Sequence, residues 1–277
     1  MHRRFAQLDV FTDEPLYGNP LAVVVDGEGM TDDEMARFAN WTNLSETTFL
    51  VPPTDPSADY RVRIFTTSGE LPFAGHPTIG SCRAWLDHGG VPATAGSVVQ
   101  ECGVGLVTLR ADGGRLAFAA PPLLRSGTVE ATAIAEIESA IGIDVIDAAW
   151  SDNGPGWIAV EVADADAVRS IEPDFRAVPH LKLGIVGSAR ADAGDYDVEV
   201  RAFYPDGRVH FEDPVTGSLN AAIAMWLMER DASLQSYVAR QGTALGRDGR
   251  VHIERGDSGQ IWVGGDTVTL ITGTVSV

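Results

Sequence analysis

Apolar residues and turn-forming residues alternate in short stretches along the first part of the chain. The apolar runs are bounded by clusters of Gly, Pro, Asn and Asp, a pattern that is typical of strands. It predicts strands over 5–11, 21–26, 47–51 and 60–66, and three more between 97 and 120.

Two segments in this part have helical periodicity instead. In residues 31–43, Thr31 and Glu34 have the spacing of a capping box. A second helix is predicted from Pro77 to Asp87, because proline is favoured at the first helical position and the following His-Gly-Gly provides a stop.

The second part of the chain repeats this alternation. A helix is predicted over 132–142 and strands over 157–162, 183–189 and 197–204, with further strands after 236. The strongest helical pattern lies at 217–230. Most of its interior is apolar and no wide polar face is present, so we expect it to be buried on most sides.

Three features recur in the same order and at a nearly constant offset, which indicates a duplicated domain. The matching pairs are GNPLAVVV (18–25) with PGWIAVEV (155–162), VRIFTTSG (62–69) with VRAFYPDG (200–207), and Gly75-His76 with Gly217-Ser218. The boundary is predicted near Pro121-Pro122, giving domains 1–119 and 120–277, and the last strand, 267–277, could return to the first domain.

This arrangement predicts an α+β fold in which each copy wraps a mostly antiparallel, barrel-like sheet around one apolar helix. Two such units side by side would leave a cleft, and ligand sites are common where domains meet. Pseudo-symmetry would then let both helix N-termini face that cleft.

Composition narrows the possible partners. Lys and Arg total 20 and Asp and Glu total 39, so the formal net charge of −19 argues against nucleic acid and anionic membrane surfaces. A small anionic metabolite stays possible, because backbone amides can bind an anion locally.

Other sequence signals are missing. Cys82 and Cys102 are too few for a disulfide framework or a four-ligand zinc site. Metal, redox and nucleotide motifs are absent. No apolar run has the length of a signal peptide or a membrane span, and a cytoplasmic protein is expected.

The two helix starts are candidate ligand sites. Gly75-His76 and Gly217-Ser218 stand where a loop becomes a helix, and such positions present unpaired N–H groups and the positive end of the helix dipole. Glycine lets a ligand approach the backbone closely. These residues could bind a carboxylate or a carbonyl oxygen, or they could serve only as caps.

Three side chains could move or orient a proton. Glu46 precedes an apolar strand, where burial would raise the pKa of its carboxyl group toward neutral pH. It could equally be an exposed acid or a cap for Ser45. Asp213, with Glu212 as an alternative, could act at the second helix or only start a turn. His76 lies where the helix dipole favours a neutral imidazole, or it could simply bond a nearby carboxylate.

The sequence resembles the PhzF family of phenazine biosynthesis-like proteins over essentially its whole length. The segments that carry the resemblance are DVFTDEPLYGNPLAVV, NLSETTFL, VRIFTTSGELPFAGHPT and EDPVTGSLNAAIA. The resemblance implies a diaminopimelate epimerase-like fold of two similar domains with the active site between them, and a homodimer.

The resemblance also implies roles for individual residues. Glu46 would be the proton carrier, acting first as base and then as acid, and Asp213 and His76 would orient the substrate. The implied reaction is similar to the isomerisation of trans-2,3-dihydro-3-hydroxyanthranilate, carried out on a small carboxylated metabolite without a cofactor. A carboxylate-based epimerase and a non-catalytic metabolite-binding protein remain the alternatives.

Substrate binding would fall to the two helix starts. Gly75, Gly217 and Ser218 are the residues that the resemblance assigns to the substrate carboxylate. Related epimerases use two cysteine thiols as bases, but the residues before the two glycines here are Ala74 and Thr216. Neither can form a thiolate, which argues against a two-thiol racemase.

Overall fold

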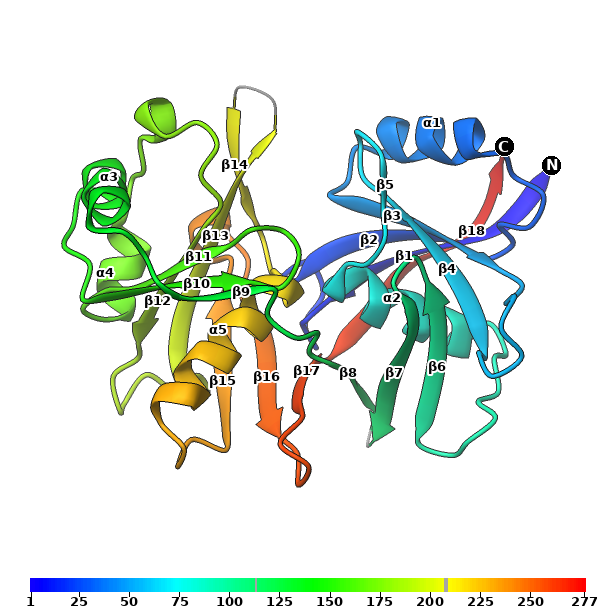
Figure 1. Ribbon diagram of the computed structural model, residues 1–277. Helices are drawn as coiled ribbons and strands as arrows, with labels where there is room; N and C mark the ends of the chain where they lie inside the picture. The colour runs from blue at the N-terminus through cyan, green and yellow to red at the C-terminus, as the bar shows by residue number, and fades with distance from the viewer. Residues whose placement is uncertain (113, 207–208) are drawn as a thin grey trace. The chain divides into compact units, whose positions relative to one another are not determined.

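The chain divides into two compact units in a computed structural model that describes residues 1–112, 114–206 and 209–277. Unit 1 comprises Met1–Ala119 and Gly264–Val277, and unit 2 comprises Ala120–Val263 (Figure 1). Gly207, the last residue of one repeated segment, lies outside the described residues. No helix in the described part of the chain has the length and apolar character needed to cross a bilayer.

Unit 1 is a curved sheet around one helix. Its strands are β1 (His2–Val10), β2 (Asn19–Val24), β3 (Glu46–Val51), β4 (Tyr60–Phe65), β5 (Glu70–Leu71), β6 (Ser97–Cys102), β7 (Gly105–Asp112), β8 (Arg115–Ala119) and β18 (Thr267–Ser276), and its helices are α1 (Asp32–Thr42) and α2 (Gly75–Asp87). The β2–β3 and β4–β6 pairs are parallel and the others are antiparallel. Helix α2 contacts most of these strands, so it is the central helix of the unit.

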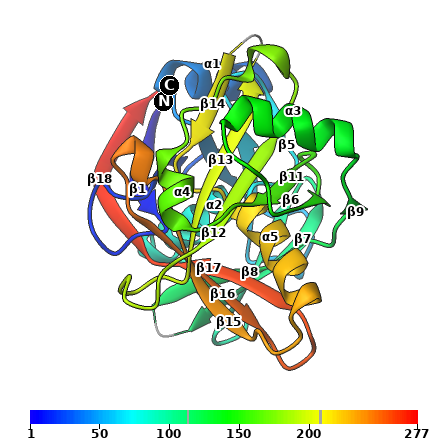
Figure 2. The same cartoon turned by 90° about the vertical axis from the view of Figure 1, so that its left-hand side faces the viewer.

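Unit 2 repeats this plan. Its strands are β9 (Arg125–Thr128), β10 (Asp147–Asp152), β11 (Ile158–Glu161), β12 (Leu183–Ser188), β13 (Val198–Asp206), β14 (Val209–Asp213), β15 (Ser236–Gln241) and β16 (Gly249–Arg255), and its helices are α3 (Ala131–Ile141), α4 (Ala165–Ser170) and α5 (Gly217–Arg230). Two short 3-10 helices, Phe175–Ala177 and Thr243–Leu245, complete it, and β17 (Ile261–Gly265) crosses the unit boundary. Helix α5 packs against β10, β12 and β16 (Figure 2).

The strand pairings confirm the duplication. In unit 2 the parallel pairs are β11–β12 and β13–β15, the counterparts of β2–β3 and β4–β6. An ion pair is repeated as well: Arg63 contacts Glu70 at 2.6 Å on β4 and β5, and Arg201 contacts Glu212 at 2.7 Å on β13 and β14. The matching sequence segments therefore occupy matching places in the two units.

Small residues bring the central helices close to their sheets. A methyl group added at Gly80 of α2 would overlap the side chain of Leu21 on β2. A methyl group added at Gly184 of β12 would overlap Leu219 of α5. Helix and sheet thus approach each other at a distance that only glycine permits.

The sequence predictions for the helices are mostly confirmed, with two corrections. The capping box of Thr31 and Glu34 starts α1 as predicted. However, α2 begins at Gly75 rather than at Pro77. The amides of the first turn have no partner within the helix, so proline is tolerated throughout that turn. The prediction also missed α4, because six residues give too little periodicity to recognise.

Candidate active site

The first turn of α2 carries a buried histidine next to a carboxylate. Its N-cap residue, Ala74, makes no side-chain hydrogen bond to the helix. Gly75 and His76 are its first two residues, and His76 is only 4% exposed. Burial lowers the pKa of His76 to about 3, so the imidazole is neutral at neutral pH.

Two parallel strands bring polar side chains to this imidazole. Asn19 is the first residue of β2 and Glu46 is the first residue of β3, and these strands are neighbours in the sheet. The Asn19 Nδ2 atom lies 3.4 Å from Nδ1 of His76, and Nε2 of His76 lies 3.5 Å from Oε2 of Glu46. The two ring nitrogens therefore face different partners.

These contacts assign the tautomer of the neutral ring. With the Asn19 amide in this orientation its nitrogen donates to Nδ1 of His76, and this pairing corresponds to the tautomer with the ring hydrogen on Nε2. That hydrogen faces Glu46, whose side chain is 15% exposed. A carboxylate of this kind can accept a proton and return it, although its Oε2 atom and Nε2 of His76 lie at 3.5 Å without the geometry of a hydrogen bond.

The first turn of α5 presents backbone amides in the same way but with different side chains. Its N-cap, Thr216, makes no side-chain hydrogen bond to the helix. Its hydroxyl donates instead to Oδ2 of Asp213 at 2.6 Å. The amides at Gly217 and Ser218 therefore lack a side-chain cap, and such amides suit an anionic ligand.

Two side chains from the loop before β11 hold Ser218. The indole Nε1 of Trp157 donates to Oγ of Ser218 at 3.2 Å, and Nδ2 of Asn153 donates to its carbonyl oxygen at 2.8 Å. Since an indole N–H can only donate, the Ser218 hydroxyl accepts here and directs its own hydrogen to another group. Ser218 is thus prepared to donate a hydrogen bond to an acceptor such as a carboxylate.

The predicted residues fall into two sets, one in each unit. Glu46, Gly75 and His76 lie in unit 1, where the structure brings Glu46 and His76 together. The other three predicted residues are Asp213, Gly217 and Ser218, which lie around the first turn of α5 in unit 2. Each set therefore surrounds the start of a central helix.

Sequence reasoning missed several residues that support these sets. They are Asn19 in unit 1 and Asn153, Trp157 and Gln241 in unit 2. Asn19 and Trp157 lie in the repeated segments 18–25 and 155–162, and that recurrence was the signal that could have found them. No pattern in the sequence indicates Gln241, which is the last residue of β15 and bonds Thr216 at the start of α5.

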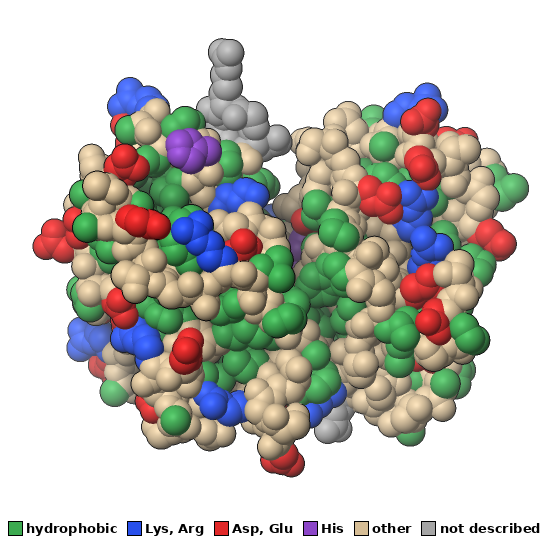
Figure 3. Space-filling view, in the orientation of Figure 1, with side chains coloured by type: hydrophobic (Ala, Val, Ile, Leu, Met, Phe, Trp, Pro, Cys, Tyr) green, Lys and Arg blue, Asp and Glu red, His purple; other side chains and the backbone are tan. Residues whose placement is uncertain are grey.

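The described residues offer no evident metal centre. No three His, Cys, Asp or Glu side chains within 1–112, 114–206 and 209–277 are grouped as ligands would be. Acidic side chains are instead spread over the visible surface of both units (Figure 3). The polar groups found around the two helix starts are carboxylates, an imidazole, hydroxyls and backbone amides.

Comparison with known proteins places these features in a family. A family model described as "Phenazine biosynthesis-like protein" matches residues 8–273. The chain is 36% identical to Antisense-enhancing sequence 1 of Schizosaccharomyces pombe, over 97% of each protein. It is 31% identical to trans-2,3-dihydro-3-hydroxyanthranilate isomerase of Pseudomonas aeruginosa, over 94% of this chain and 92% of that protein.

Solved structures confirm the predicted fold. A phenazine biosynthesis protein of the PhzF family from Enterococcus faecalis superposes with a TM-score of 0.83 at 24% identity, covering 100% of both chains. A hydroxyproline epimerase from Agrobacterium vitis has a TM-score of 0.61 at 15% identity, covering 100% of this chain and 93% of that one. The diaminopimelate epimerase-like fold that the family resemblance implied is therefore confirmed.

Proposed function

This chain belongs to the family of phenazine biosynthesis-like proteins, and we propose that it is a cofactor-independent isomerase that moves a proton within a small carboxylated metabolite. Similarity to relatives named isomerases supports the class of reaction. The single observation that carries the mechanism is the contact between Glu46 and the Nε2–H group of a neutral, buried His76.

Glu46 is the proposed proton carrier. As a carboxylate it would take a proton from a saturated carbon of the substrate, and the electron pair of that C–H bond would enter the adjacent conjugated system. The protonated Glu46 would then return the proton to another carbon of the same system. One group acts as base and then as acid, so the reaction is balanced without an oxidant or a second substrate.

The proposed role of His76 is to keep Glu46 ready for the first step. Its Nε2 atom lies 3.5 Å from the carboxylate and would orient that group through a hydrogen bond once a substrate is bound. Because burial holds the pKa of His76 near 3, the imidazole does not take the proton itself at neutral pH. The proton therefore stays with Glu46 until it returns to the substrate.

The helix starts are proposed to hold the substrate. The amides of Gly217 and Ser218 and the donating hydroxyl of Ser218 are suited to a carboxylate group. Gly75 presents a backbone amide in the first turn of α2. Asp213 is proposed to orient an amino or hydroxyl group of the same molecule.

The test is Glu46→Gln, assayed with trans-2,3-dihydro-3-hydroxyanthranilate in deuterated water. We expect turnover and deuterium incorporation to fall together by about a hundred- to ten-thousand-fold, the usual contribution of a positioned acid–base group. The matched control is Glu136→Gln, on the exposed face of α3, which should retain wild-type rates.

Each alternative has a distinct result. Wild-type exchange and turnover in Glu46→Gln would rule out the proposed proton carrier. Deuterium uptake with inversion at one carbon and no bond migration would indicate an epimerase. Tight binding with no exchange at all would indicate a binding protein.

A further inference from the structure

A buried glutamine organises the polar groups around the start of α5. Gln241 is the last residue of β15 and is fully buried. Its Oε1 accepts from the backbone amide of Thr216 at 3.0 Å and from Nδ2 of Asn220 at 2.8 Å. Its Nε2 donates to the carbonyl oxygen of Asp213 and to Oγ1 of Thr216, both at 3.0 Å.

These four bonds fix the orientation of the Gln241 amide. A backbone N–H can only donate and a carbonyl oxygen can only accept. The amide of Thr216 therefore requires Oε1 on its side, and the carbonyl of Asp213 requires Nε2 on the other. Turning the amide over would oppose both bonds, so both the acceptor and the donor capacity of Gln241 are committed.

The orientation of Gln241 in turn sets the direction of the next bond. Because Nε2 of Gln241 donates to Oγ1 of Thr216, the threonine hydroxyl accepts there and must direct its own hydrogen elsewhere. That hydrogen goes to Oδ2 of Asp213, at 2.6 Å, a distance usual for a hydroxyl bonded to a carboxylate.

The local alternative for this hydroxyl is helix capping, and the structure does not use it. A threonine at an N-cap normally accepts from an amide of the first turn, which contributes about 1 kcal/mol. Thr216 makes no such bond, so its side chain leaves the amides of the first turn uncapped. The hydroxyl is committed to the carboxylate instead.

We infer that Thr216 is a positioning residue for Asp213, and that Gln241 makes it a donor. The hydroxyl holds the carboxylate of Asp213 in one orientation, while the same arrangement leaves the helix amides for a ligand. This inference rests on the proposed function, since it assumes that Asp213 contacts the substrate.

The experiment compares Thr216→Ser, Thr216→Val and Gln241→Glu. Serine keeps the hydroxyl, and valine removes it at nearly the same volume. A glutamate at 241 can only accept when ionised, so it would turn the Thr216 hydrogen away from Asp213. The assay measures kcat and KM on trans-2,3-dihydro-3-hydroxyanthranilate, with folding checked by circular dichroism.

We expect Thr216→Ser to stay within about threefold of the wild type. Thr216→Val and Gln241→Glu should each lower kcat by about ten- to a hundredfold with KM within about threefold, which is the cost of one hydrogen bond to a charged group. The variant that combines Thr216→Val with Gln241→Glu should be no slower than Thr216→Val alone. If Thr216→Val does not fold, Gln241→Glu decides by the same kcat criterion.

Two outcomes would overturn the inference: unchanged kcat in Thr216→Val, or an equal loss in Thr216→Ser, which would mean that packing rather than the hydroxyl matters. A wild-type protein inactive on this compound would count against the proposed function instead. In that case the bond between Thr216 and Asp213 is tested by urea unfolding. The proteins compared are Thr216→Val, Asp213→Ala and the variant that combines these two changes. Each single change should raise the unfolding equilibrium constant about tenfold and the double change no further, whereas additive losses of stability would refute the bond.

Discussion

The central helices of the two units begin alike but carry different side chains in their first turns. Both α2 and α5 begin without a side-chain cap, so each presents backbone amides. In unit 1 the second helical residue is a neutral His76 next to Glu46, whereas in unit 2 it is Ser218. Both copies thus have a helix start without a side-chain cap from the N-cap residue, whereas a carboxylate next to a neutral imidazole is found in unit 1.

A side chain from the repeated segment supports the second helical residue in each unit. Asn19 donates to Nδ1 of His76, and Trp157 donates to Oγ of Ser218. The effect of this hydrogen bond differs between the two units. In unit 1 the donor sets a tautomer, and in unit 2 it makes a hydroxyl available as a donor.

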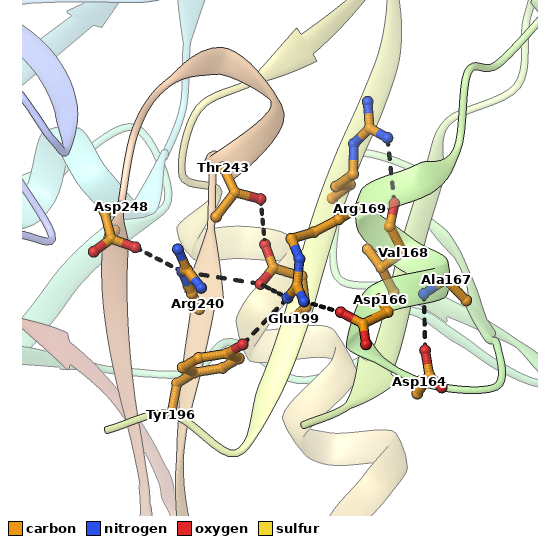
Figure 4. Close-up of polar contacts among 12 residues, drawn as sticks. Asp164, Asp166, Ala167, Val168, Arg169, Tyr196, Glu199, Arg240, Thr243 and Asp248 are labelled. Atoms are coloured by element: carbon orange, nitrogen blue, oxygen red, sulfur yellow. Dashed lines mark hydrogen bonds and ion pairs between the residues drawn. The ribbon is translucent and has the colours of Figure 1, made fainter. Parts of the chain in front are cut away.

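The units also differ in how charge is placed on matching strands. Arg61 of β4 pairs with Glu101 of β6 at 3.6 Å, and Glu199 of β13 pairs with Arg240 of β15 at 4.0 Å, with the charges exchanged. Glu199 is fully buried, and burial raises the pKa of its carboxyl group. Surrounding donors partly offset the effect of burial on this pKa. They include the Thr243 hydroxyl at 2.6 Å and the Arg169 guanidinium at 3.2 Å (Figure 4).

The largest expected difference concerns the repeated arginine–glutamate pair. In unit 2 the side chains of Arg201 and Glu212 are only 5% and 10% exposed. In unit 1, Glu70 is 42% exposed and Arg63 has a second partner, Asp32, at 2.6 Å. Glu212→Gln should therefore lower the free energy of unfolding by about 3 kcal/mol, while Glu70→Gln should lower it by about 1 kcal/mol or less.

Urea unfolding of the two variants at neutral pH measures this difference. The substitution is the same in both, so each variant is the control for the other. Equal losses would mean that burial does not separate the two copies of the pair.

Much of this arrangement could be predicted from the sequence, and the remainder depends on contacts between distant segments. The buried character of α5 followed from its apolar pattern, and the roles of Glu46 and Asp213 were implied by resemblance. The tautomer of His76 could not be predicted, because it requires Asn19, which is 57 positions away in the chain, to lie against the ring. The same holds for Trp157, which reaches Ser218 from 61 positions away.

A second expected difference is in the pH dependence of stability. His76 binds its proton near pH 3 when folded and near its ordinary value of 6.5 when unfolded. The unfolded chain therefore binds more protons between these values, and stability falls as the pH drops through this window. The loss should be about 3 kcal/mol between pH 7 and pH 4.

His76→Gln tests this expectation, because it should lack that part of the slope when unfolding is followed from pH 7 to pH 4. His180→Gln, at an exposed position in unit 2, is the control and should keep the wild-type slope. Parallel curves for the wild type and His76→Gln would contradict the neutral, buried state of this ring.

The smallest expected effects are changes in kcat and KM on removing the hydrogen-bond donors Asn19 and Trp157. Asn19→Leu removes the donor to Nδ1 of His76, so the hydrogen can move to Nδ1 and leave a lone pair on Nε2 facing Glu46. We expect kcat to fall by about tenfold with little change in KM. Trp157→Phe removes the donor to Ser218, which should raise KM by about three- to tenfold with a smaller change in kcat.

Steady-state kinetics on trans-2,3-dihydro-3-hydroxyanthranilate, together with ¹⁵N chemical shifts of the His76 ring, measure both effects. The controls are Asn40→Leu, which loses only an exposed bond to Thr67, and Trp150→Phe, which loses an exposed bond to Glu130. A kcat loss for Asn19→Leu and a KM increase for Trp157→Phe would place proton transfer in unit 1 and binding in unit 2. The reverse assignment would require the catalytic group to be sought around α5, with Asp213 rather than Glu46 as the first candidate.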